Sequence, residues 1–200
     1  MNSREDIVIT GWGCVSPLGG DAASTWNALV SGQDGRGPIT AIPVEGCRVT
    51  HGAESALPAL DWISKKDVSR LSRASRLALP AAREAMADAG ILDSLGQSLF
   101  SRLEMSLSTT ACGMEFGEAF LRGLWSSNPR HQTSRMSRYP AQQQISDLQQ
   151  HLGFSGPAMI VSNACASGAN AIGHAGDLIR GGFADIVLTG GFEAFCELVF

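Results

Sequence analysis

Residues 158–188 read AMIVSNACASGANAIGHAGDLIRGGFADIVL and decide the fold of this chain. They begin with an apolar run at 158–161, turn at 163–168, continue at helical spacing from 169 to 179, and end in a second apolar run at 184–188. Short apolar runs bounded by turn residues are typical of buried strands. The stretch therefore predicts a strand, a sharp turn, a helix and a second strand, with Cys165 at the turn.

The predicted helix is unusual because most side chains between residues 164 and 176 are Ala, Ser or Gly. Each Gly costs a helix interior roughly 1 kcal/mol relative to Ala, so intrinsic propensity does not favour this helix. Small side chains do let a helix approach sheets and other helices closely on several sides. We therefore expect the helix to lie in the middle of the molecule.

Strands and helices alternate along the rest of the chain. β-Branched residues predict a strand at 6–11, and alternating apolar and polar residues predict one at 103–108 with one buried face. Helical spacing and terminal residues predict helices at 21–32, 73–89, 116–124 and 140–153, with Pro80 expected to kink or restart the second. Residues 33–58 and 126–139 are predicted to be loops. This alternation predicts an α/β fold with a largely parallel sheet.

Composition excludes several classes of protein. With 44% hydrophobic and 17% charged residues in 200, the chain is not disordered. A net charge of -4 without a Lys/Arg stripe argues against nucleic acid as a partner. The apolar run near the N-terminus is too short for a signal peptide or a membrane span, so we expect a cytoplasmic protein without membrane association. The closing run of apolar residues, without a cap or turn, predicts an incomplete domain.

The five cysteines are widely spaced and form no C-x-x-C pair, which argues against a disulfide framework and a metal site. Cys165 stands at the expected start of the small-residue helix. The positive end of the helix dipole and the unpaired N–H groups of the first turn favour a thiolate, and the same N–H groups can stabilise an oxyanion. Cys165 is therefore a candidate nucleophile. The alternative is a small residue that fills a tight turn, since free cysteines are often merely buried.

A nucleophilic cysteine normally needs a base or a cation nearby. His174 lies nine residues further along, which places it about 180° around a helix and ~13.5 Å along it, on the opposite face. His51, His131 and His151 are expected at the surface. We therefore expect the partners of Cys165 to lie outside these 200 residues.

Three stretches of the chain support a family resemblance: IVITGWGCVSPLG at 7–19, LALPAAREAMADAGI at 77–91 and SNACASGANAIGHAGDLIRGGFADIVLTGGFE at 162–193. In order and spacing they resemble the N-terminal half of the β-ketoacyl-[acyl-carrier-protein] synthases. These are the decarboxylating condensing enzymes of fatty acid and polyketide biosynthesis. The resemblance covers most of the chain.

The resemblance implies a thiolase-like, layered α/β/α/β/α fold of two similar halves, of which residues 1–200 are the first. It implies an acyltransferase in which Cys165 accepts the acyl group and contributes its backbone N–H to the oxyanion hole. Two histidines and a second N–H come from the other half in this family and cannot be placed here. Substrates would arrive on the phosphopantetheine of an acyl carrier protein, with no other cofactor. A homodimer is implied, and a heterodimer with a related subunit is the alternative.

Three positions depart from the family pattern. Asn163 stands where Ser or Thr is commoner, residues 108–113 replace a glycine-richer stretch that borders the acyl pocket, and a Gln run occupies 142–144. We therefore expect Ala111, Cys112 and Met114 to line or gate the acyl pocket, the alternative being that they pack the core. The departures favour a specialised or polyketide-like pathway over housekeeping elongation.

Three other interpretations are weaker. A biosynthetic thiolase carries its nucleophile much nearer the N-terminus than residue 165. A catalytically silent partner subunit similar to a chain-length factor lacks the cysteine that this chain has. A serine hydrolase requires a G-x-S-x-G turn after a strand, which is not present here.

Overall fold

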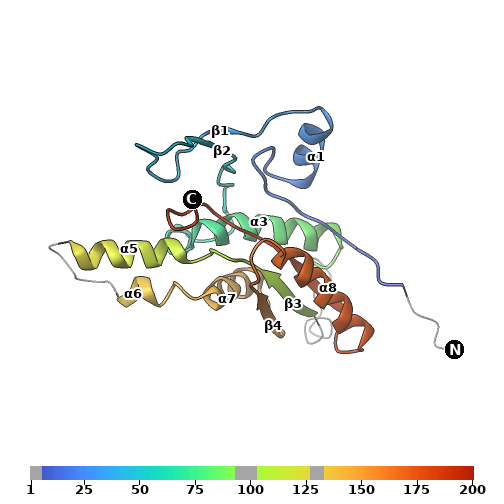
Figure 1. The fold of residues 1–200 in the computed structure, drawn as a ribbon. Coiled ribbons are helices and arrows are strands. Elements are labelled where there is room, and N and C mark those ends of the chain that lie inside the picture. The colour runs from blue at the N-terminus through green and yellow to red at the C-terminus, as the bar shows by residue number, and fades with distance from the viewer. Residues whose placement is uncertain (1–5, 93–102, 127–132) are drawn as a thin grey trace.

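The computed structural model describes residues 6–92, 103–126 and 133–200. Its elements in chain order are α1 (Ala22–Val30), β1 (Gly37–Pro38), β2 (His51–Gly52), α2 (Lys65–Val68), α3 (Arg73–Asp88), β3 (Leu103–Ser108), α5 (Met114–Trp125), α6 (Thr133–Met136), α7 (Ala141–Leu152), β4 (Ala158–Val161), α8 (Ser167–Arg180) and β5 (Ile186–Gly191). The pair β1–β2 and α1 lie above α3 in Figure 1, away from the larger sheet.

The larger sheet has three parallel strands in the order β4-β3-β5, which confirms the prediction of a parallel sheet. Ser108, the last residue of β3, pairs with Val161 at the end of β4 and with Gly191 at the end of β5. The three strands therefore end in register. The segments that follow them, beginning at residues 109, 162 and 192, leave the sheet side by side.

The central strand β3 is buried on both faces, so the prediction of a single buried face is wrong. Leu103, Met105 and Leu107 belong to the hydrophobic core, together with residues of α3 and α7. On the other face, Ser106 is fully buried and donates its hydroxyl to the carbonyl oxygen of Ala171 in α8, at 3.0 Å. A small polar residue is tolerated under a helix when its hydrogen bond is satisfied, and an alternating pattern cannot reveal that partner.

The core lies between the sheet and the helices α3 and α7 (Figure 1). Leu79 of α3 and Leu148 of α7 are at most 1% exposed. The helix α3 runs without interruption from Arg73 to Asp88 and includes Pro80, so it does not restart there. The buried apolar residues on both sides of Pro80 offset the hydrogen bond that a proline cannot donate.

The helix α8 packs across all three strands on the opposite side of the sheet (Figure 1). Its buried residues are Ser167, Ala171 and Ala175, all small, as close packing requires. Its other face is exposed in this chain, where the side chain of Ile172 is 56% exposed. Within the described residues the sheet covers one side of α8, so the expectation that α8 is covered on several sides is not met by this part of the chain.

The predicted strand at 6–11 is absent, although these residues are described. Instead the segment that follows docks on α3: a Cβ at Gly13 would lie 2.0 Å from the Ala81 carbonyl oxygen, and the Cys14 N–H donates to Glu84 at 2.9 Å. Val8 and Ile9 are 70% and 88% exposed. β-Branched residues suit a pleated, half-buried surface, but a strand also needs a neighbouring strand, and none of the described strands pairs with residues 6–11.

The remaining elements agree with the expectations only in part, because two predicted loops contain short regular elements and α2 was not predicted. The predicted loops at 33–58 and 126–139 contain the short β1–β2 pair and α6, and the structure places the second strand of the 158–188 unit at Ile186–Gly191. Asp21 caps α1 by accepting the Ser24 N–H at 2.6 Å, as expected for a helix that begins at residue 22. None of the described helices combines the length and the hydropathy that a membrane-spanning segment requires.

Candidate active site

Cys165 lies between the end of β4 and the start of α8, at the edge of the sheet where all three strands end. Cys165 is exposed in this chain. In α/β proteins, ligands bind at the carboxyl ends of parallel strands. The predicted strand–turn–helix unit is confirmed, and it places the thiol at this functional edge.

The backbone turns sharply just before Cys165. Ala164 has φ +60°, and among the described residues it is the only one other than glycine with a positive φ. A left-handed conformation costs a residue with a side chain of order 1–3 kcal/mol, and such strain is typical of functional sites. Because of this conformation at Ala164, the backbone changes direction between the end of β4 and Cys165.

Ser167 stabilises this turn through hydrogen bonds to the backbone of the residues before Cys165. This buried residue accepts the Asn163 N–H at 2.8 Å and donates its hydroxyl to the Ala164 carbonyl oxygen at 2.6 Å. Its own N–H also donates to that carbonyl, at 3.1 Å. Cys165 precedes the first turn of a 14-residue helix, where backbone N–H groups and the helix dipole favour negative charge.

No described histidine shares a hydrogen bond with Cys165. His174 lies half-buried on α8, nine residues after Cys165, and His51 is an exposed residue of β2. His151 is half-buried at the end of α7 rather than fully at the surface as expected, and His131 lies outside the described residues. The described part of the chain also contains no cluster of three or more His, Cys, Asp or Glu side chains that could hold a metal ion.

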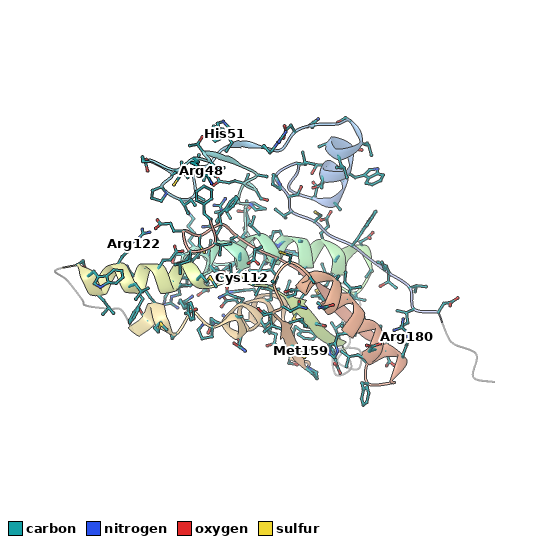
Figure 2. All side chains as sticks on the ribbon, in the orientation of Figure 1. Arg48, His51, Cys112, Arg122, Met159 and Arg180 are labelled. Carbon is teal, nitrogen blue, oxygen red and sulfur yellow. The ribbon has the colours of Figure 1, made fainter. Side chains whose placement is uncertain are left out.

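The three candidates for the acyl pocket follow β3. Ala111 and Cys112 are 3% and 6% exposed, whereas Met114 begins α5 and is half-buried. Figure 2 shows Cys112 near the middle of the molecule, where α5 approaches the sheet. Burial raises the pKa of the Cys112 thiol, so Cys112 is a poor competitor for acylation.

Thr110 connects this segment to the Cys165 turn, because its hydroxyl donates to the Ala164 carbonyl oxygen at 3.2 Å. The structure therefore brings the segment that follows β3 next to the nucleophile candidate. The role of Ala111, Cys112 and Met114 at an acyl pocket stays a prediction.

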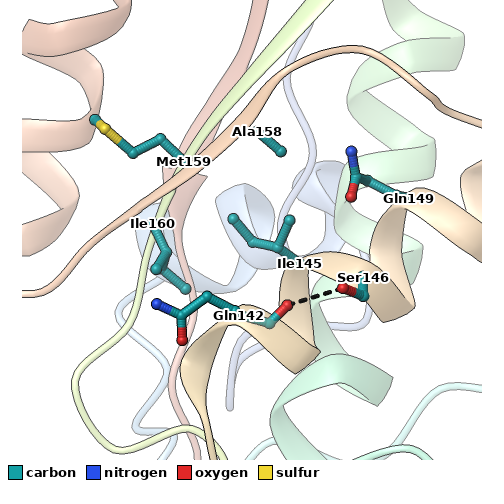
Figure 3. A pocket seen from close by; sticks show the side chains of 7 residues that line it. All are labelled: Gln142, Ile145, Ser146, Gln149, Ala158, Met159 and Ile160. Atoms are coloured by element: carbon teal, nitrogen blue, oxygen red, sulfur yellow. Dashed lines mark hydrogen bonds between the residues drawn. The ribbon is translucent and has the colours of Figure 1, made fainter.

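A shallow pocket of about 370 Å³ lies elsewhere, between α7 and the edge strand β4 (Figure 3). Its lining includes Gln142 of the glutamine run singled out in the sequence, with Ile145 and Ser146 from the same helix. Ser146 donates its hydroxyl to the Gln142 carbonyl oxygen at 3.1 Å. Cys165 does not line this pocket.

Sequence reasoning missed Glu193, which follows β5 at the same edge. Its carboxylate accepts the Thr109 hydroxyl at 3.0 Å and the N–H groups of Thr110 and Ala111, both at 2.9 Å. Glu193 thereby ties the segment after β5 to the segment after β3. The available signal was an acidic residue five positions after the end of the strand predicted at 184–188, separated from it by the sequence TGGF.

A family model described as "Beta-ketoacyl synthase, N-terminal domain" matches residues 4–199. This chain belongs to the β-ketoacyl synthase family. The family resemblance drawn from the three sequence stretches is confirmed.

The similar proteins agree with this assignment. The chain is 33% identical over 200 residues to 3-oxoacyl-[acyl-carrier-protein] synthase 2 of Staphylococcus aureus (strain COL), covering 97% of this chain and 47% of that protein. It is 36% identical over 195 residues to nodulation protein E of Rhizobium sp. (strain N33), covering 95% of this chain and 48% of that protein. The β-ketoacyl synthase chain thus spans about half the length of these curated relatives.

Among solved structures, the ishigamide ketosynthase/chain length factor matches with a TM-score of 0.86 and 28% identity, over 98% of this chain and 49% of that chain. The α/β, thiolase-like fold class is confirmed by this likeness, with the chain again matching about half of its relative. The match supports a ketosynthase-type chain over the thiolase and hydrolase alternatives.

Proposed function

We propose that the protein containing this chain is a β-ketoacyl-[acyl-carrier-protein] synthase that condenses a Cys165-bound acyl group with malonyl-carrier. The observation that carries the proposal is the placement of Cys165 at an exposed, strained turn between β4 and the N-terminus of α8. The name of the Staphylococcus aureus relative supports the reaction and the carrier. On this proposal residues 1–200 form the N-terminal half of the catalytic domain.

The first half-reaction is acyl transfer. The Cys165 thiolate attacks the thioester carbonyl of the acyl carrier, and the carbonyl electrons move onto oxygen to form a tetrahedral oxyanion. The Cys165 N–H stabilises this oxyanion as one donor of the oxyanion hole. When the oxyanion collapses, the carbon–sulfur bond to the carrier phosphopantetheine breaks, the carrier thiol leaves, and Cys165 holds the acyl group as a thioester.

The second half-reaction is decarboxylative condensation. Malonyl-carrier loses carbon dioxide, and the resulting enolate attacks the Cys165 thioester carbonyl. A carbon–carbon bond forms, the bond to Cys165 Sγ breaks, and the electrons return to the thiolate. The two histidines that stabilise the enolate in this family are proposed to lie outside residues 1–200. The reaction as proposed needs no cofactor besides the carrier-bound phosphopantetheine.

An acyl carrier protein is the proposed partner, and the proposed assembly is a homodimer in the cytoplasm. The alternative, a heterodimer with a related subunit, is supported by the description of the ishigamide ketosynthase/chain length factor structure. A silent partner subunit would itself have no need of a nucleophile at an exposed strained turn. Sedimentation of the protein alone and with candidate subunits distinguishes the two assemblies.

Intact mass after incubation with acyl carrier tests the proposed nucleophile. One acyl adduct is expected, and it should map to the peptide that contains Cys165. Cys165→Ala should abolish the adduct, whereas Cys47→Ala, at the other exposed cysteine, should retain it. An adduct that persists in Cys165→Ala, or that maps to another cysteine, would show that the assignment is wrong.

A further inference from the structure

The Ala164 carbonyl oxygen receives an unusual number of hydrogen bonds. Ser167 donates its hydroxyl at 2.6 Å and its N–H at 3.1 Å, and Thr110 donates its hydroxyl at 3.2 Å. A carbonyl oxygen has two lone pairs, so three donors saturate it. Two of the donors come from α8, whereas Thr110 comes from the segment after β3.

This carbonyl and the Cys165 N–H belong to the same peptide group. Hydrogen bonds polarise one another along a chain, by an amount put at 10–30% per bond. A donor at the carbonyl oxygen therefore makes the N–H at the other end of the peptide a stronger donor. The three bonds also fix the plane of the peptide, and so the direction in which the N–H points.

Thr110 is itself held in place. Its N–H donates to Oε2 of Glu193 and the next N–H, of Ala111, donates to Oε1, both at 2.9 Å. Thr110 is exposed, so its hydroxyl could turn to water, but its backbone is fixed by a carboxylate from a third segment. The bond from Thr110 to Ala164 is thus supported by the ends of all three strands.

We propose that Thr110 is a positioning residue for the oxyanion donor: its hydroxyl orients and polarises the Ala164–Cys165 peptide, so that the Cys165 N–H stabilises the tetrahedral oxyanion more strongly. The inference rests on the proposed function, because it assigns that role to the Cys165 N–H. It predicts that Thr110 affects acylation of Cys165, which forms an oxyanion, but not alkylation of the same thiol, which forms none.

The test compares two reactions of Cys165 in the intact protein. p-Nitrophenyl acetate acylates a thiol through a tetrahedral oxyanion, whereas iodoacetamide alkylates it by direct displacement. The rates are measured from the peptide that contains Cys165, and the exposed Cys47 serves as an internal reference. Thr110→Val removes the hydroxyl while keeping the shape, and Thr110→Ser restores the hydroxyl.

In Thr110→Val, acylation of Cys165 should slow about threefold to tenfold, the scale of one neutral hydrogen bond, while alkylation changes by less than about twofold. Thr110→Ser should regain the acylation rate. An unchanged ratio of acylation to alkylation in Thr110→Val would overturn the proposal. So would a parallel fall of both rates, a failure of Thr110→Ser to restore acylation, or a wild-type Cys165 that is acylated no faster than Cys47.

Loading of wild-type protein from acyl carrier tests the proposed function separately. If p-nitrophenyl acetate acylates Cys165 with the expected dependence on Thr110, but acyl carrier does not load it, the role of Thr110 stands and the proposed synthase function fails. If acyl carrier loads Cys165 and the ratio does not depend on Thr110, the synthase function stands and the role of Thr110 fails.

Discussion

Replacement of Glu193 by alanine should destabilise the edge of the sheet that carries Cys165. The carboxylate accepts hydrogen bonds from Thr109, Thr110 and Ala111. Thr109 and Ala111 are both 3% exposed, so water cannot readily replace the lost acceptor at these two donors. The Thr110 N–H belongs to an exposed residue and can bond to water instead.

The magnitude follows from these two buried donors. Each buried group left without a partner costs about 1–3 kcal/mol. Because Glu193 is an exposed residue and the loop can relax, the lower part of this range applies, and Glu193→Ala should lower the free energy of unfolding by about 3 kcal/mol in total. Glu193→Gln keeps one acceptor oxygen and should cost about half as much.

Urea denaturation of the intact protein measures this change, with Glu197→Ala as the matched control. Glu197 lies four residues further along and pairs with Arg122 at the surface. Exposed ion pairs contribute about 0–1 kcal/mol, so the control should change little. If Glu193→Ala destabilises the protein no more than Glu197→Ala does, the carboxylate does not hold the segment after β3, and the reasoning is refuted.

Three further outcomes can be measured independently. Burial raises the pKa of the Asp147 carboxyl above its usual value of 3.8, so the folded protein binds this proton more tightly than the unfolded chain does. The ionised carboxyl therefore destabilises the fold, and this destabilisation should be relieved as pH falls through the folded pKa. Asp147→Asn should flatten the dependence of urea stability on pH in that range. Ala171, fully buried under Ser106, leaves no room for a larger side chain, so Ala171→Leu should cost about 1–3 kcal/mol in urea denaturation. Ala111→Phe should shorten the acyl chains that the protein accepts, measured by mass spectrometry of its products, and an unchanged profile in a folded variant would remove Ala111 from the pocket.

The unit at residues 158–188 was predictable because its signals are local. A short apolar run, a turn and a helix of small residues occur in sequence order, and the structure places the helix at Ser167–Arg180 and the second strand at Ile186–Gly191. The position of Cys165 follows from this unit alone. The small residues also predicted correctly that α8 approaches the sheet closely, through Ala171 and Ala175.

The N-terminal segment shows why the same reasoning fails elsewhere. Residues 6–11 have the composition of a strand, yet the chain around them docks on α3, where the Gly11 backbone lies so close that a Cβ would be 2.3 Å from the Ala85 carbonyl oxygen. The composition of a segment indicates the kind of surface on which its side chains would pack well, but it does not determine which part of the protein the segment contacts. The helix α3 that this segment contacts is far away along the chain, as the hydrogen bond between Cys14 and Glu84, 70 residues apart, illustrates.

Glu193 was missed for a related reason. Its hydrogen bonds join residues 82 to 84 positions apart, and no periodicity connects them. Only the register of the sheet, in which Ser108 pairs with Gly191, brings the two segments together. A carboxylate that closely follows a strand predicts hydrogen bonds to another segment only when the neighbouring strand in the sheet is known.

Two parts of the chain hold the backbone around Cys165 in place. The turn itself, with Ala164 and Ser167, belongs to the local unit that the sequence motif describes. The hydroxyl of Thr110 reaches the same carbonyl from the segment after β3, and Glu193 fixes that segment from beyond β5. A substitution at Thr110 or Glu193 can therefore change the chemistry of Cys165 while the motif around the cysteine stays intact. For this reason the motif identifies the candidate nucleophile, but the register of three parallel strands determines how well its backbone N–H is held.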